Sequence, residues 1–115
     1  MDAQEFIHSI KTVVIDNSIK GVEELLNKPP GRKPSQHLVE LSDWFNQQTD
    51  DNKTMISKIV KESVEMSVFV FLCVLDGVTA IEIGPDKGKL LLYYEKNNNR
   101  KLLNSEETEY LHNLL

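Results

Sequence analysis

The sequence has a single cysteine, Cys73, among its 115 residues. One thiol excludes an internal disulfide and a cysteine-rich metal site, so we expect a buried core thiol in a reducing compartment. Residues 68–75, which contain Cys73, form the longest apolar run, and a membrane span needs about 20 such residues. The acidic first residues lack the basic and apolar regions of a secretory signal. We therefore expect a soluble, cytoplasmic protein.

Catalytic motifs are also missing. Residues 84–89 differ from a phosphate loop in the spacing of their glycines, and Leu90 stands where Ser or Thr would follow the lysine. No Gly-x-Ser-x-Gly elbow is present. Glu62 and Glu65 lie among lysines, where acids serve solubility. The three histidines have no ligand-like spacing for zinc: His8, His37 and His112. These absences predict a protein that is not an enzyme and has no cofactor and no metal site.

The composition predicts one folded domain over residues 1–115. Hydrophobic residues make up 40% of the chain and charged residues 27%, which is typical of globular proteins. The 18 acids and 13 bases give a formal net charge of −5. That charge disfavours binding to nucleic acid or to an anionic membrane and favours a basic protein partner.

Three helices are expected in the first two-thirds of the chain. Asp2 and Glu5 have capping-box spacing, and an apolar face containing Phe6, Ile10, Val13 and Val14 predicts a helix that ends near Asn27. The prolines of residues 29–34 end this helix. A second helix begins after Ser35, and a third begins after the caps at residues 49–52. Trp44 and Phe45 are expected in the core at this spacing; the alternative is an exposed aromatic anchor for a partner.

Residues 68–75 allow two interpretations. Their β-branched and aromatic content, followed by Asp76-Gly77, is a hairpin signal. Alternatively, the third helix continues to Leu75 and Gly77 ends it in a left-handed cap. We favour the helix, because residues 56–64 set a helical phase and no breaker precedes Asp76. A helix apolar on all sides would be the central, buried one.

After Gly77 the apolar period changes to two, which predicts strands. We expect strands at residues 78–83 and 90–95, joined by a turn at 84–88, and a short third strand at 100–103 after an asparagine turn. Asn104 and Glu107 would cap a terminal helix. The predicted class is therefore α+β, with N-terminal helices, a long central helix, a small antiparallel hairpin or three-stranded meander, and a short C-terminal helix.

The acids of the last third fall at predicted turns, strand ends and a helix start. Such positions are exposed and rigid, which suits recognition of a basic surface. The candidate partner-binding residues are Asp76, Glu82, Asp86, Glu95, Glu106, Glu107 and Glu109.

The second half of the chain resembles small immunity proteins of bacterial polymorphic and contact-dependent toxin systems. The resemblance covers about 45 residues: the run 69–75, then Asp76-Gly77-Val78, the strand pair that ends at Tyr94, and residues 103–104 and 110–115. It implies an acidic cytoplasmic inhibitor that occupies the active site or substrate surface of a cognate toxin domain, and it assigns no role to a single residue.

Two other classes fit the same sequence. One is a homo-oligomeric accessory protein of a phage or mobile element. The other is a small ligand-binding domain or enzyme whose polar groups converge only in the folded state.

Overall fold

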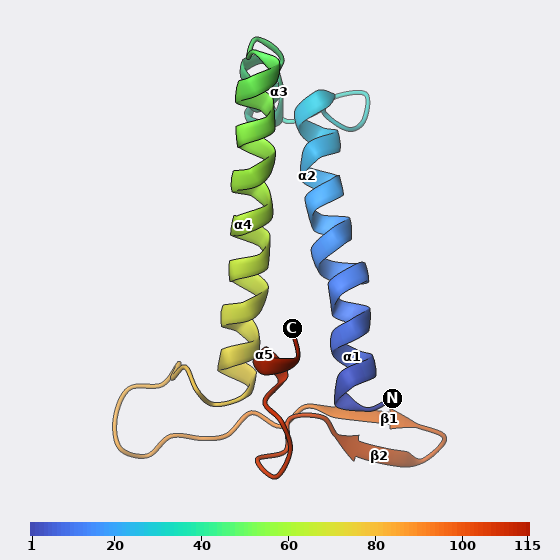
Figure 1. Cartoon of the computed structure of the whole chain (residues 1–115), viewed down its shortest axis with the longest axis vertical. Coiled ribbons are helices and arrows are strands. Elements are labelled where there is room, and N and C mark those ends of the chain that lie inside the picture. The colour runs from blue at the N-terminus through green and yellow to red at the C-terminus, as the bar shows by residue number, and fades with distance from the viewer.

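Two long helical segments lie side by side and form an upright arm, with a broad foot at its lower end (Figure 1). The computed structural model describes all residues, 1–115, and its class is α+β, as predicted. The elements in chain order are α1 (Ala3–Ile10), η1 (Lys11–Asp16), α2 (Asn17–Asn27), α3 (Gln36–Asn46), α4 (Asp50–Leu75), β1 (Tyr93–Lys96), β2 (Asn99–Leu102) and α5 (Leu111–Leu114).

The helices of the arm begin where the sequence places side-chain caps. The Asp2 carboxylate accepts a 2.8 Å hydrogen bond from the N–H of Glu5. The Ser35 and Thr49 hydroxyls likewise accept bonds from the N–H groups three residues later. Each cap satisfies a backbone donor that the first helical turn leaves unpaired.

The first predicted helix is continuous over α1, η1 and α2, but η1 is π-helical. Ile7 and Ile15 are both buried, although eight residues in a regular α-helix would place them about 80° apart. The wider π turns offset this rotation. Val13, which the regular period placed on the buried face, is instead 63% exposed.

Residues 68–75 are helical, so the preferred interpretation is confirmed. Gly77, with a φ of +74°, follows the end of α4 in the left-handed conformation that favours glycine. The expectation that α4 is the central buried helix is wrong. Only Leu72 and Cys73 are buried along it, because no helix packs along the side of α4 that faces away from the α1–η1–α2 segment.

The core is small. Ile7, Leu72 and Leu111 form a buried cluster where α5 packs against α1 and α4. At the other end of the arm, Phe45 is buried as predicted, whereas the Trp44 side chain is exposed and does not join the core. Only nine of the 115 residues are buried.

The sheet is a hairpin of two strands, not a three-stranded meander. β1 pairs antiparallel with β2, with Tyr93 opposite Leu102. Asn97 and Asn98 both have positive φ, 54° and 63°, the geometry of the tight turn that suits this connection. The predicted strand at residues 78–83 and the predicted hairpin at 84–88 are wrong, since residues 78–92 form neither helix nor strand. Their alternating apolar side chains have no layer to pack against.

The short C-terminal helix is confirmed, but it begins later than Asn104: α5 covers Leu111–Leu114 and follows Tyr110, so Asn104 does not cap it. The Asn104 side chain instead bonds to residues at both ends of the preceding loop. None of the helices combines the length and the apolar content that a bilayer span requires.

Candidate functional site

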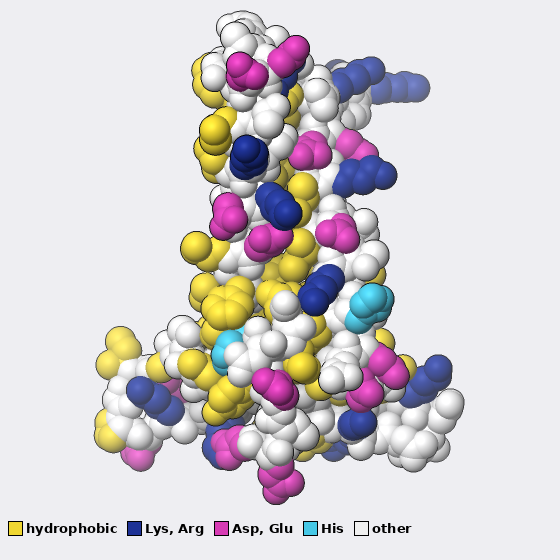
Figure 2. Space-filling view, viewed as in Figure 1, with side chains coloured by type: hydrophobic (Ala, Val, Ile, Leu, Met, Phe, Trp, Pro, Cys, Tyr) yellow, Lys and Arg dark blue, Asp and Glu magenta, His cyan; other side chains and the backbone are white.

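The loop between α4 and β1, residues 76–92, is the most unusual surface of the molecule, and we call it the foot loop. Figure 2 shows hydrophobic side chains at the outer end of the foot, where this loop extends from α4. Ile83 is fully exposed. Four other large apolar side chains of the loop are exposed as well: Val78, Ile81, Leu90 and Leu91. An apolar group of this size without packing partners is typical of an interaction site.

The backbone of the foot loop also has few hydrogen-bonding partners. From Ala80 to Leu91 no backbone N–H or C=O takes part in a backbone–backbone hydrogen bond. Solvent-exposed backbone groups of this kind can pair with a strand of another protein, as exposed sheet edges do. The loop therefore offers an apolar surface and backbone N–H and C=O groups that are free apart from the Gly88 N–H and the Leu90 C=O, which bond to side chains.

One side chain fastens the two ends of the foot loop together. The Asn104 amide nitrogen donates to the carbonyls of Leu75 and Leu90, at 2.6 and 2.8 Å. Its oxygen accepts a 2.8 Å bond from the N–H of Leu92. We call this arrangement the Asn104 clasp. It fixes the base of the loop while leaving its apolar tip in solvent.

Asp76 fixes the start of the loop to α5. Its side chain is only 1% exposed. One carboxylate oxygen accepts from the N–H of Leu111 at 3.0 Å, and the other from the N–H of His112 at 2.9 Å. The second oxygen also lies 2.7 Å from Nδ1 of His112. A carboxylate only accepts hydrogen bonds, so Nδ1 carries the proton. The His112 ring is further held by Tyr110, which stacks on it, and by the edge of Phe69.

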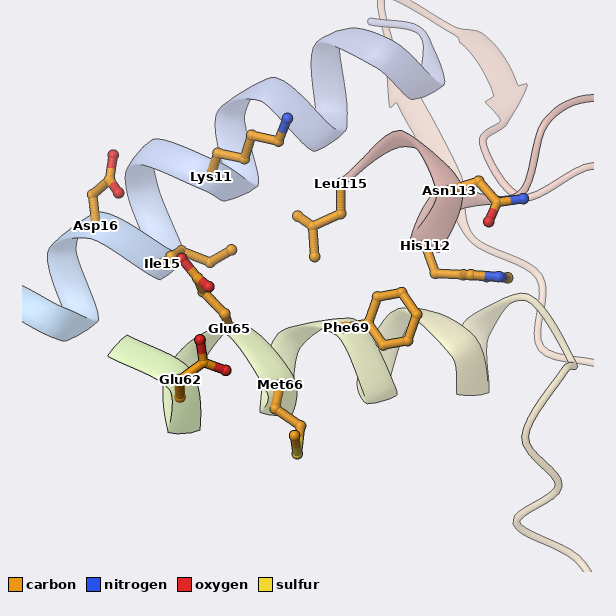
Figure 3. A pocket seen from close by; sticks show the side chains of 10 residues that line it. All are labelled: Lys11, Ile15, Asp16, Glu62, Glu65, Met66, Phe69, His112, Asn113 and Leu115. Atoms are coloured by element: carbon orange, nitrogen blue, oxygen red, sulfur yellow. The ribbon is translucent and has the colours of Figure 1, made fainter. Parts of the chain in front are cut away.

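A hollow of about 660 Å³ opens beside this histidine, between η1 and α4 (Figure 3). Its polar lining includes Lys11, Asp16, Glu62, Glu65 and His112. Cys73, the one thiol, does not line it. No group of His, Cys, Asp and Glu side chains in the molecule is arranged to hold a metal ion. His112 is oriented by Asp76, and no serine, threonine or cysteine lines the hollow beside it.

Of the seven predicted partner-binding acids, three have side-chain hydrogen bonds or ion pairs within the chain and four have none. Asp76 was expected on an exposed rigid surface, and this expectation is wrong, because α5 covers its carboxylate. The Glu82 carboxylate accepts from the N–H of Gly88 within the foot loop. Glu106 forms a 2.7 Å ion pair with Lys89, which lowers the pKa of the Glu106 carboxyl through a hydrogen bond and through charge. The remaining four are exposed and have no ion pair: Asp86, Glu95, Glu107 and Glu109.

These acids do not form one patch. Asp76, Glu82, Glu106 and Glu107 line a second hollow of about 600 Å³, between the foot loop and residues 102–110. Glu95 lies in β1, which extends from the opposite side of the foot (Figure 1). Sequence reasoning assigned partner binding to the acids alone and missed the apolar residues between them. The signal is the alternation of residues 78–83, which the sequence interpretation assigned to a strand paired with residues 90–95 and not to an exposed surface.

Comparison with protein-family models, with curated proteins and with solved structures finds no match for this chain.

Proposed function

We propose that this chain is a protein-binding inhibitor of the immunity type, which binds a basic bacterial toxin domain through the foot loop. It acts by occlusion, covering the toxin's active site or its substrate-binding surface. The observation that carries the proposal is the exposed apolar tip of the foot loop, held on a fixed base by the Asn104 clasp.

The foot loop has the features that strand-addition partners use. Its apolar side chains alternate at residues 79–83, and from Ala80 to Leu91 its backbone forms no backbone–backbone hydrogen bond. Within this stretch the Gly88 N–H and the Leu90 C=O bond to side chains of the same chain. A partner that pairs with this backbone would satisfy the remaining N–H and C=O groups, and alternate side chains such as Ile81 and Ile83 would enter its surface pockets. Because the Asn104 clasp already fixes the loop ends, binding would order only the tip, which lowers the entropic cost of association.

Charge would supply the preference for a basic surface. Asp86 lies in the foot loop and is free of intrachain ion pairs, and the chain as a whole carries a formal charge of −5. Exposed acids at the edge of an apolar contact mainly raise the association rate and exclude acidic partners. If the chain is an immunity protein, as the resemblance implies, this binding takes place in the cytoplasm of the toxin-producing cell and protects that cell from its own toxin.

Binding to the product of the adjacent upstream gene tests the proposal, since immunity genes stand beside their toxin genes. We expect the purified chain to bind that product, with an association rate that falls as salt rises. Replacing both Ile81 and Ile83 by Lys should weaken binding at least about 30-fold, as loss of a central apolar contact does. Val13→Lys is the matched control, because Val13 is exposed on η1, away from the foot.

The expected pattern is loss of affinity in the Ile81 and Ile83 double variant with an unchanged circular dichroism spectrum. Equal binding by the double variant and by the Val13 control would show that the foot loop is not the binding surface. A chain that does not bind the neighbouring product at all would contradict the immunity role itself.

A further inference from the structure

The chain exposes far more surface than a folded monomer of its mass. Its accessible area is 8715 Å², whereas a compact 13.2 kDa protein exposes about 6,400 Å². The radius of gyration is 18.5 Å, against about 13 Å for a compact chain of this length. The excess, about 2,300 Å² per chain, is ample for one face of a stable dimer, which buries about 800 Å² on each partner.

Part of the exposed apolar surface lies on the arm, because α4 is apolar on two sides. Ile56, Val60 and Val64 are partly buried on the side that faces the α1–η1–α2 segment. A second row is exposed: Met55, Ile59, Met66 and Val70. At about 100° per residue the second row lies roughly 110° round the helix from the first. We call it the outer face of α4. Figure 3 shows Met66 pointing away from the segment that carries Lys11 and Ile15.

The outer face has a symmetric spacing. Its residues are separated by four, seven and four positions, so the row is the same when read in either direction from its midpoint, between Glu62 and Ser63. Two copies of α4 packed antiparallel about a two-fold axis at that midpoint would place Met55 against Val70 and Ile59 against Met66 of the second copy. A two-fold interface requires this kind of self-complementary surface.

The polar side chains near the outer face have partners within their own chain. Lys61 and Glu65 form an ion pair at 3.9 Å along α4, and Glu65 points towards η1 (Figure 3). The Ser63 hydroxyl donates to the Ile59 carbonyl of its own helix at 2.8 Å, so it needs no partner across the contact.

We propose that the outer face of α4 binds a second copy of this chain in antiparallel orientation, which turns two helical arms into a four-helix bundle. This dimer leaves both foot loops free at opposite ends of the bundle. It does not depend on the proposed inhibitor function, because the two surfaces share no residue.

Molar mass in solution provides the first test. Light scattering during size-exclusion chromatography should give twice the 13.2 kDa of the chain. Replacing Ile59 and Met66 by Lys should return the mass to that of one chain with helicity retained, and the Val13→Lys control should stay dimeric. A wild-type chain that is monomeric at about 100 µM, where even weak dimers with a Kd in the micromolar range are populated, would overturn the proposal. A double variant with Lys at positions 59 and 66 that is still dimeric would also overturn the proposal.

Crosslinking through single cysteines tests the orientation. In a Cys73→Ala background, Glu62→Cys lies next to the two-fold axis and should crosslink to its own copy with a short bifunctional thiol reagent. Met55→Cys should not, because antiparallel pairing separates the two copies of residue 55 by about 22 Å along the helix. Efficient crosslinking at both positions would contradict the antiparallel arrangement.

Discussion

Removing the Asn104 clasp is expected to destabilise the whole foot. Asn104→Ala eliminates three hydrogen bonds of 2.6 to 2.8 Å, two to carbonyl oxygens and one from a backbone N–H. Each such bond contributes about 1 kcal/mol net, and the site is partly open to water, which can replace some of them. The expected loss in the free energy of unfolding is therefore about 2 to 3 kcal/mol.

Urea and thermal unfolding followed by circular dichroism measure this loss. For a chain of this size it corresponds to a fall in Tm of roughly 10 °C. Asn104→Asp should be at least as harmful, because a carboxylate still accepts from Leu92 but faces the carbonyls of Leu75 and Leu90 without a donor.

Asn113→Ala is the matched control, since Asn113 is exposed and its side chain forms no hydrogen bond. Its effect should stay within about 0.5 kcal/mol. Hydrogen exchange at the Leu92 amide gives a local measure of the same contact, and that amide should lose protection in Asn104→Ala. If Asn104→Ala unfolds within about 0.5 kcal/mol of the wild type and Leu92 stays protected, the clasp does not fix the loop.

Three further predictions follow from other contacts. Asp76→Ala should cost about 3 kcal/mol or more in urea unfolding, because two backbone N–H groups lose a charged acceptor; a smaller cost would mean that water replaces it. Cys73, 7% exposed, should react slowly with a thiol reagent in the native state, and Cys73→Ala should cost about 1 kcal/mol; rapid labelling would contradict its burial. Lys89→Ala should raise the pKa of Glu106 towards its ordinary value in an NMR titration; no change would mean that the ion pair does not form in solution.

The sign of the last effect follows from the lowered pKa of Glu106. A carboxyl whose pKa is lower in the folded state contributes stability above its ordinary pKa, and that contribution is lost as the pH falls through the lowered value. The pair is exposed, so salt should weaken it.

Local signals in the sequence predicted most of the helical arm. The caps at Asp2, Ser35 and Thr49 each bond to a backbone N–H three residues later. The turn between β1 and β2 is set by Asn97 and Asn98 themselves, which both have positive φ. The continuation of α4 to Leu75 followed from a helical phase that no breaker interrupts. In each case the residues that decide the structure are neighbours in the chain.

Contacts between distant residues account for the errors. The Asn104 amide bonds to Leu75, 29 positions earlier, and that bond outweighs its local tendency to cap a helix. Asp76 is buried by Leu111 and His112, which lie 35 and 36 positions later. The π-helical turn in η1 depends on packing that a fixed helical period cannot describe. The foot loop has strand-like alternation, but no segment of the chain pairs with it.

Growth rescue measures the proposed function most directly. Cells that express the product of the adjacent upstream gene should stop growing, and co-expression of this chain should restore growth. The Val13→Lys control should protect as well as the wild type, and the chain with Lys at positions 81 and 83 should not protect, although it accumulates to the same level. Full protection by that double variant, or no protection by the wild type, would contradict the claim that the foot loop neutralises a toxin.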